Sequence, residues 1–220
     1  MVNNINRLCS ELVFITLSGV GVLLSTHLFT DHVFSKDFYV YYTNITNYLC
    51  LAIIIWCFIQ NIKAIKQGNT FIPNKKINII KSVACILIAI TFLIYNTLLA
   101  DFSLNNYFFN LYNILYHVVC PIWFIVYTLK TTKKAFWLAP ALAVVFQLVY
   151  VAFVFIRASI LSGKAGRIIF PYFFLNYKTL GFGGTVKWLF IMMVSTLFIG
   201  YCLQGIKWLI TNKKTNKKRT

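Results

Sequence analysis

Charged residues are scarce in this sequence. They make up 11% of its 220 residues and only four are acidic, whereas a soluble domain is about 25% charged. Apolar residues make up 60%, against roughly 45–50% in soluble domains. Folded in water, such a chain would expose large apolar patches, and the same numbers exclude disorder. The sequence therefore predicts an integral membrane protein.

The sequence also lacks cysteine pairs at the spacings typical of disulfide, redox or metal-binding motifs. None of the six cysteines forms a CxxC motif, and Cys50 and Cys57 share a helix face without being close enough to bridge. Five of the six lie in apolar stretches, where cysteine packs as a small hydrophobe. His117 and Cys120 supply only two of the three or four ligands that a metal site needs. We predict no disulfide framework, no metal site and no cofactor.

Positive charge, in contrast, is abundant. The 21 Lys and Arg residues give a net charge of +17. They cluster in short segments between apolar runs, which is the pattern that sets membrane topology and contacts anionic lipid head groups. No basic domain stands apart from the apolar runs, so we expect membrane lipids and not nucleic acid as partners. The oligomeric state is left open.

Six segments are long and apolar enough to cross a bilayer, which takes roughly 20 residues of helix. They lie near 11–30, 39–60, 82–100, 107–129, 136–156 and 186–210. The first has too long an apolar stretch and no cleavage pattern for a signal peptide. We predict an all-α, polytopic bundle of six transmembrane helices in one domain, residues 1–212, followed by a basic tail, residues 213–220.

The distribution of Lys and Arg predicts the orientation of this bundle. With the N-terminus inside, 15 of them fall on the cytoplasmic side and 6 on the outer side, so both termini are predicted to be cytoplasmic. The 61–81 stretch is then a basic cytoplasmic loop. The aromatic-rich 157–185 stretch is predicted to be an interfacial or partly re-entrant segment on the outer side.

Polar side chains inside the spans indicate where a site can lie, because they are expensive in lipid and usually face the bundle interior. Four predicted helices carry them on one face, as stripes that can line one pocket. In chain order the stripes are Thr43, Thr46 and Asn47; Thr91 and Tyr95; Asn110, Asn113 and His117; Gln147 and Tyr150.

His117 stands out as the one histidine well inside a span, four residues before Pro121. Proline has no N–H, so the His117 carbonyl lacks its intrahelical partner and the helix should open or kink there. The site is either a titratable ring placed for chemistry or a packed histidine beside an ordinary proline kink. Arg157, at the outer end of the fifth span, either snorkels to lipid phosphates or holds an anionic head group over the pocket.

Four short motifs occur in a familiar order: YYTNITN (41–47), IYN (94–96), YNILYHVVCP (112–121) and FPYFFLN (170–176). In these the chain resembles the Pr6Pr family of bacterial six-span membrane proteins, which looks related to the androgen-induced and androgen-dependent TFPI-regulating proteins of animals. The animal relatives hydrolyse fatty acid esters of hydroxy fatty acids with a threonine and a histidine. The resemblance implies Thr43 as nucleophile and His117 as base. The chain differs from the family at two places. No acid follows Pro121, and Asn176 stands where the family has an acid.

Three hypotheses remain after this comparison of motifs. The first is a Thr43/His117 lipid-ester hydrolase with Asn47, Asn113, Tyr95 and Arg157 around a lipid-like substrate. The others are a small-molecule carrier and a non-catalytic structural or sensory protein. Thr43 and His117 would differ in depth by roughly 8 Å if both helices were straight, so their contact is not decided by the sequence.

Overall fold

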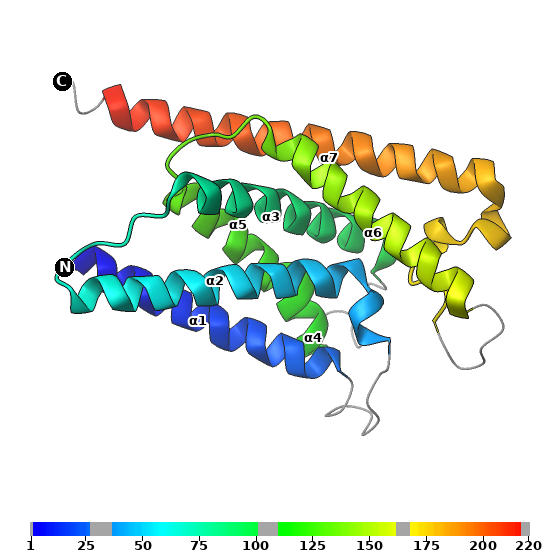
Figure 1. Ribbon diagram of the computed structural model, residues 1–220, viewed down its shortest axis with the longest axis horizontal. Coiled ribbons are helices and arrows are strands. Elements are labelled where there is room, and N and C mark those ends of the chain that lie inside the picture. Colours follow the sequence, from blue (N-terminus) through cyan, green and yellow to red (C-terminus); the bar gives the residue numbers. More distant parts are fainter. Residues whose placement is uncertain (1, 27–36, 101–109, 162–167, 217–220) are drawn as a thin grey trace.

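The computed structural model describes residues 2–26, 37–100, 110–161 and 168–216. Within these ranges the regular structure is helical, and six helices are long and apolar enough to cross a membrane. The predicted all-α, six-span membrane protein is confirmed. The helices form an elongated bundle in which α1 starts and α7 ends on the same side (Figure 1). We call this side the terminal end and the opposite side the distal end.

The helix bounds extend beyond the apolar stretches that predicted them. The spans are α1 (Val2–Ser25), α2 (Tyr42–Lys66), α3 (Lys75–Ile94), α4 and α5 together, α6 (Ala139–Leu161) and α7 (Tyr177–Asn216). The fourth span consists of α4 (Leu111–Ile114), a π-helical turn (Leu115–Val119) and α5 (Cys120–Thr131). Each residue added to an existing helix gains one hydrogen bond, so helices continue into polar sequence. The 61–81 stretch is accordingly helical except for residues 67–74, which corrects the predicted loop.

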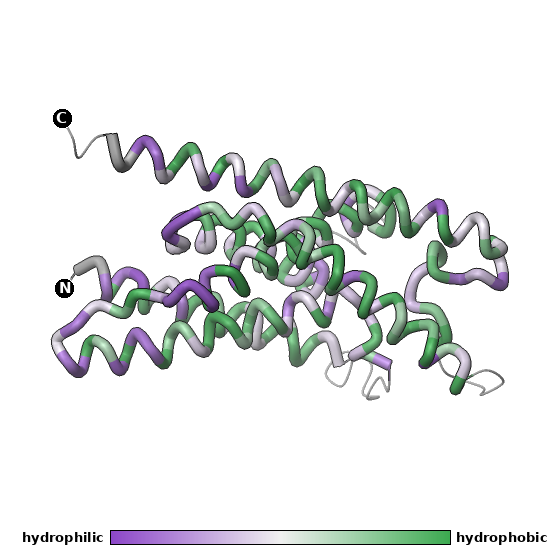
Figure 2. The backbone as a smooth tube through the Cα atoms, turned by 45° about the horizontal axis from the view of Figure 1, so that its top comes forward, coloured by the Kyte–Doolittle hydropathy of each residue, from purple (hydrophilic) through white to green (hydrophobic). Residues whose placement is uncertain are grey.

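Helix α3 is the centre of the bundle, because it is apolar on all sides and can be covered on all sides. One face packs against α6, α7 and the segment before α7, through Ile86, Leu87 and Ile90. The other face packs against α1, α2 and α5, mainly through Cys85 and Ile88. The hydropathy of the chain follows this arrangement, with the most hydrophilic stretches toward the ends of the bundle (Figure 2).

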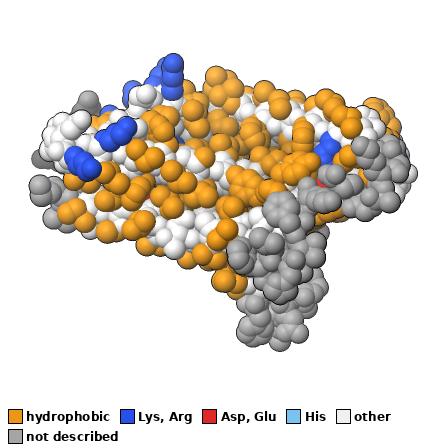
Figure 3. Space-filling view, turned by 60° about the horizontal axis from the view of Figure 1, so that its bottom comes forward, with side chains coloured by type: hydrophobic (Ala, Val, Ile, Leu, Met, Phe, Trp, Pro, Cys, Tyr) orange, Lys and Arg blue, Asp and Glu red, His pale blue; other side chains and the backbone are white. Residues whose placement is uncertain are grey.

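The outer surface of the bundle is mostly apolar. Figure 3 shows hydrophobic side chains over the middle of one face and most of its Lys and Arg side chains gathered at one end. Large side chains such as Leu142, Val145, Val149 and Ile156 of α6 are exposed. A surface of this kind is stable only in contact with lipid. Together with the six apolar helices it defines a multi-pass membrane protein.

The segment before α7 folds back into the distal end of the bundle. Tyr172, Phe174 and Leu175 are buried in the core around α3, although only residues 173–175 are helical there. Non-helical backbone is tolerated at membrane depth when protein surrounds it. Only part of the predicted interfacial stretch lies outside the long helices, because residues 157–161 belong to α6 and residues 177–185 belong to α7. Residues 162–167 of this stretch lie outside the described residues.

A buried ion pair fastens this segment to the bundle. The Arg157 guanidinium donates to the carboxylate of Asp37 and to the carbonyl of Ile168, and the Ile168 N–H donates to the second Asp37 oxygen at 2.9 Å. Asp37 and Arg157 are 5% and 7% exposed. The two charges are therefore paired in a low-dielectric environment, where separating them is expensive.

Candidate functional site

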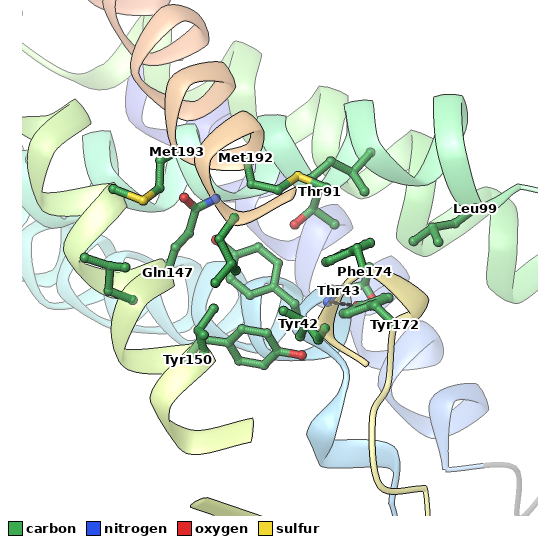
Figure 4. Close-up of a pocket in the computed structure, with 15 residues that line it drawn as sticks. Tyr42, Thr43, Thr91, Leu99, Gln147, Tyr150, Tyr172, Phe174, Met192 and Met193 are labelled. Carbon is green, nitrogen blue, oxygen red and sulfur yellow. Dashed lines mark hydrogen bonds between the residues drawn. The ribbon is translucent and has the colours of Figure 1, made fainter. Parts of the chain in front are cut away.

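Two cavities meet at Thr43, which is the second residue of α2. The polar cavity, of about 270 Å³, is lined by Thr43 and His117 together with Tyr95, Asn113 and Tyr172. The apolar cavity, of about 60 Å³, lies between α3, α6 and α7 (Figure 4). Its lining includes Leu148, Val151, Leu189, Met192 and Met193. Thr43, Leu99 and Tyr172 line both cavities, so Thr43 lies where a polar space adjoins an apolar one.

The His117 ring is fixed by aromatic neighbours. It stacks on the Tyr95 ring, with centroids 3.3 Å apart and planes 7° from parallel, and the Tyr112 ring meets it edge-on at 5.7 Å. The side chain is 2% exposed, and its Nδ1 has no hydrogen-bond partner among the described residues. Aromatic rings therefore hold the imidazole in one orientation, with no carboxylate of the described residues bonded to Nδ1, and this nitrogen can accept a proton.

The helix opens at His117, as the proline four residues later predicts. Residues Leu115–Val119 form a π-helical turn in which the Cys120 N–H reaches back to the Leu115 carbonyl. Because the Cys120 N–H bonds the Leu115 carbonyl, the Tyr116 carbonyl has no backbone donor. Pro121 has no N–H, so the His117 carbonyl has none either. Two asparagines from other parts of the chain donate to these carbonyls. Asn47 donates to the Tyr116 carbonyl at 3.2 Å, and Asn96 donates to the His117 carbonyl at 3.0 Å.

Replacing Asn96 with alanine should destabilise the protein by about 1–3 kcal/mol, because the buried His117 carbonyl loses its donor. The Pro121→Ala substitution returns a backbone N–H to the same carbonyl. The loss caused by Asn96→Ala should therefore be smaller in the Pro121→Ala background than in wild type. Thermal or denaturant unfolding of the four proteins in detergent gives this double-mutant cycle. Equal losses in both backgrounds would contradict the assignment of Asn96 as the substitute donor.

Both backbone polar groups of Thr43, its carbonyl and its N–H, form hydrogen bonds. Its carbonyl accepts from the Thr46 hydroxyl at 3.0 Å and from the Asn47 amide at 2.8 Å. Its N–H donates to the Tyr172 hydroxyl at 3.3 Å, which is the dashed contact in Figure 4. The first turn of α2 is thus held from inside the helix and from the segment before α7, and the Thr43 side chain remains directed at the cavities.

The residues predicted around the substrate separate into two groups. Tyr95 and Asn113 line the polar cavity with Thr43 and His117. Asn47 and Arg157 are not in the lining of either cavity, because the amide of Asn47 binds two carbonyls and the guanidinium of Arg157 binds Asp37 and Ile168.

The predicted stripes divide between the two adjoining cavities: Thr91, Gln147 and Tyr150 line the apolar cavity, whereas Tyr95, Asn113 and His117 line the polar one. Thr46 and Thr91 share a hydrogen bond at 3.0 Å. Gln147 accepts from Thr196 at 3.0 Å, and Tyr150 donates to the Val40 carbonyl at 2.9 Å. Most of these polar groups therefore join helices to one another.

The depth difference anticipated between Thr43 and His117 does not keep them out of one cavity. That argument assumed straight, parallel helices. The fourth span instead crosses the bundle obliquely (Figure 1), and its π-helical turn lies at His117 itself. Both side chains consequently border the same space.

A second polar cluster, which the sequence analysis did not identify, lies at the terminal end. The fully buried Glu11 carboxylate accepts from Arg7 at 3.1 Å, from Asn61 at 2.6 Å and from the Tyr127 hydroxyl. It joins α1, α2 and α5. The available signal was an acid at the start of the first predicted span with a base four residues earlier, since charges in membrane helices come with partners.

Two lysines of the same region are also buried. Lys81, assigned to a cytoplasmic loop by the sequence analysis, is 0% exposed, donates to the Thr131 hydroxyl and lies 4.7 Å from the centroid of the Tyr127 ring. Lys207 donates to the Leu129 carbonyl at 2.8 Å. Both ammonium groups therefore lie at the C-terminal end of α5, where positive charge is favourable.

Comparison of the chain with known protein families, curated proteins and solved structures found no match. The class defined by fold and site is a six-span membrane protein with a threonine and a histidine in the lining of one cavity.

Proposed function

We propose that this protein is a membrane hydrolase of lipid esters, with Thr43 as nucleophile and His117 as base. One observation carries the proposal: Thr43 lies at the junction of a polar cavity lined by His117 and a small cavity with a mostly apolar lining. The resemblance of the YYTNITN and YHVVCP motifs to the Pr6Pr family supports the same pair of residues.

The chemistry balances with these two side chains and water. His117 takes the hydroxyl proton as Thr43 Oγ1 forms a bond to the ester carbonyl carbon, and the carbonyl oxygen becomes an oxyanion. The tetrahedral intermediate collapses, the ester C–O bond breaks, and His117 returns the proton to the leaving alcohol. Water, deprotonated by His117, then hydrolyses the acyl-threonine.

The apolar cavity indicates a lipid-like substrate. Its walls come from α3, α6 and α7, and Met192 and Met193 provide flexible side chains that adapt to a chain of varying shape (Figure 4). Leu148 and Val149, next to this cavity on α6, are exposed on the surface that faces lipid. We infer that a substrate dissolved in the bilayer enters laterally from this face.

The charge asymmetry of the sequence places the site with respect to the membrane. The terminal end carries most of the Lys and Arg, so the positive-inside rule puts it in the cytoplasm. Thr43 and His117 then lie in the outer half of the bilayer. Together with the resemblance to a bacterial family, this charge distribution supports the proposal that the protein lies in a bacterial plasma membrane.

A fluorophosphonate probe tests the proposal, because it labels only an activated hydroxyl. Purified protein in detergent should be labelled, the modified peptide should contain Thr43, and a long-chain ester should slow the reaction. If folded wild-type protein is not labelled, the hydrolase proposal is wrong and the carrier and structural hypotheses take its place.

A further inference from the structure

An ester hydrolase needs a donor for the oxyanion, and the asparagines beside Thr43 are already in use. The Asn47 amide donates to the carbonyls of Thr43 and Tyr116. The Asn44 amide donates to the Phe38 carbonyl at 2.6 Å, and its oxygen accepts from Tyr112 at 2.9 Å. Using the Asn47 amide for the oxyanion would leave buried carbonyls without their donors, and the Asn44 side chain is held by Phe38 at its nitrogen and by Tyr112 at its oxygen.

The Tyr172 hydroxyl is placed differently. It lies against Thr43, accepts the Thr43 N–H at 3.3 Å, and belongs to the lining of both cavities. A phenol that accepts one hydrogen bond still has its own O–H to donate. A tyrosine hydroxyl has an ordinary pKa of about 10, so it keeps this proton at neutral pH.

The position of this hydroxyl is determined by rigid contacts. The Tyr172 ring stacks on Phe174 at 5.1 Å with planes 4° apart and meets Tyr41 edge-on at 6.1 Å. The chain four residues earlier is tied to the bundle by the Asp37–Arg157 pair. A donor held in place before the reaction stabilises a developing negative charge without reorganisation.

We propose that Tyr172 is a catalytic residue whose hydroxyl donates to the oxyanion formed when Thr43 attacks an ester carbonyl. This inference rests on the proposed hydrolase function. It assigns the 170–176 segment a direct part in the reaction, beyond closing the distal end of the bundle.

The test compares wild type with Tyr172→Phe, which keeps the stacked ring and removes only the hydroxyl. We expect kcat for a long-chain ester to fall by about 10²–10³-fold with little change in KM, the range found for loss of one oxyanion donor. The labelling rate with the fluorophosphonate should fall in parallel, because its phosphonyl oxygen takes the place of the oxyanion. Tyr48→Phe is the matched control, since Tyr48 lies on α2, bonds Ser25 at 2.9 Å and lines neither cavity.

The outcomes separate the two proposals. If wild type is labelled and Tyr172→Phe is labelled at the same rate, the role of Tyr172 is overturned and the hydrolase proposal stays intact. A rise in KM without a fall in kcat also overturns it, because the hydroxyl then binds substrate only. Folded wild type that is not labelled overturns both. Thermal unfolding of each variant shows whether a slow rate reflects loss of folded protein.

Discussion

Replacing His117 with alanine is expected to lower the rate of ester hydrolysis by about 10²–10⁴-fold, the usual contribution of a general base. Thr43→Val, which keeps the branched shape and removes the hydroxyl, should abolish covalent labelling altogether. Because Thr43 and His117 act on the same proton, the double variant should be no slower than Thr43→Val alone. Initial rates with a long-chain ester and gel-based labelling measure both effects.

Thr97→Val is the matched control for this experiment. Thr97 is an exposed threonine on a second π-helical turn, Tyr95–Leu99, which follows α3, and its hydroxyl donates to the Leu93 carbonyl at 2.8 Å. It lines neither cavity, so its loss should leave labelling and turnover unchanged. Full activity in Thr43→Val, or an equal loss in Thr97→Val, would show that the threonine at the cavity junction is not the nucleophile.

The second large effect is expected at the terminal end, in stability. Glu11→Met should reduce the free energy of unfolding by about 3–5 kcal/mol, because removing one partner leaves the Arg7 charge without its carboxylate. Asn61 and Tyr127 lose the acceptor that they share. Thermal unfolding in detergent should show the loss, and the five tryptophans of the chain give an intrinsic fluorescence signal.

The Arg7→Met/Glu11→Met double variant should be more stable than Glu11→Met alone, since replacing both charges with apolar side chains removes the unpaired one. Leu12→Met provides the control, because Leu12 is the next residue on α1 and is 51% exposed. If Glu11→Met is no less stable than Leu12→Met, the buried carboxylate does not hold α1 to α2 and α5.

Membrane insertion and helix number follow from local features that the sequence contains in full. Each span needs enough consecutive apolar residues to cross the bilayer, and inside lipid every backbone polar group must be satisfied within the protein, which a helix does for most of its own groups. The opening of the fourth span was predictable for the same kind of reason. Pro121 removes one N–H, and the carbonyl affected is always the one four residues before it, that of His117.

The tertiary structure alone decided which polar side chains meet. Periodicity places Asn47 on the same helix face as Thr43, but the tilt of neighbouring helices directs its amide to the Tyr116 carbonyl instead of the cavity. Arg157 and Asp37 are 120 residues apart, and Tyr172 reaches Thr43 from 129 residues away. Glu11 and Lys81 looked like end-of-span charges until packing buried them. Local sequence determines how each segment folds, whereas contacts between helices depend on their rotation, tilt and depth, which only the packed bundle sets.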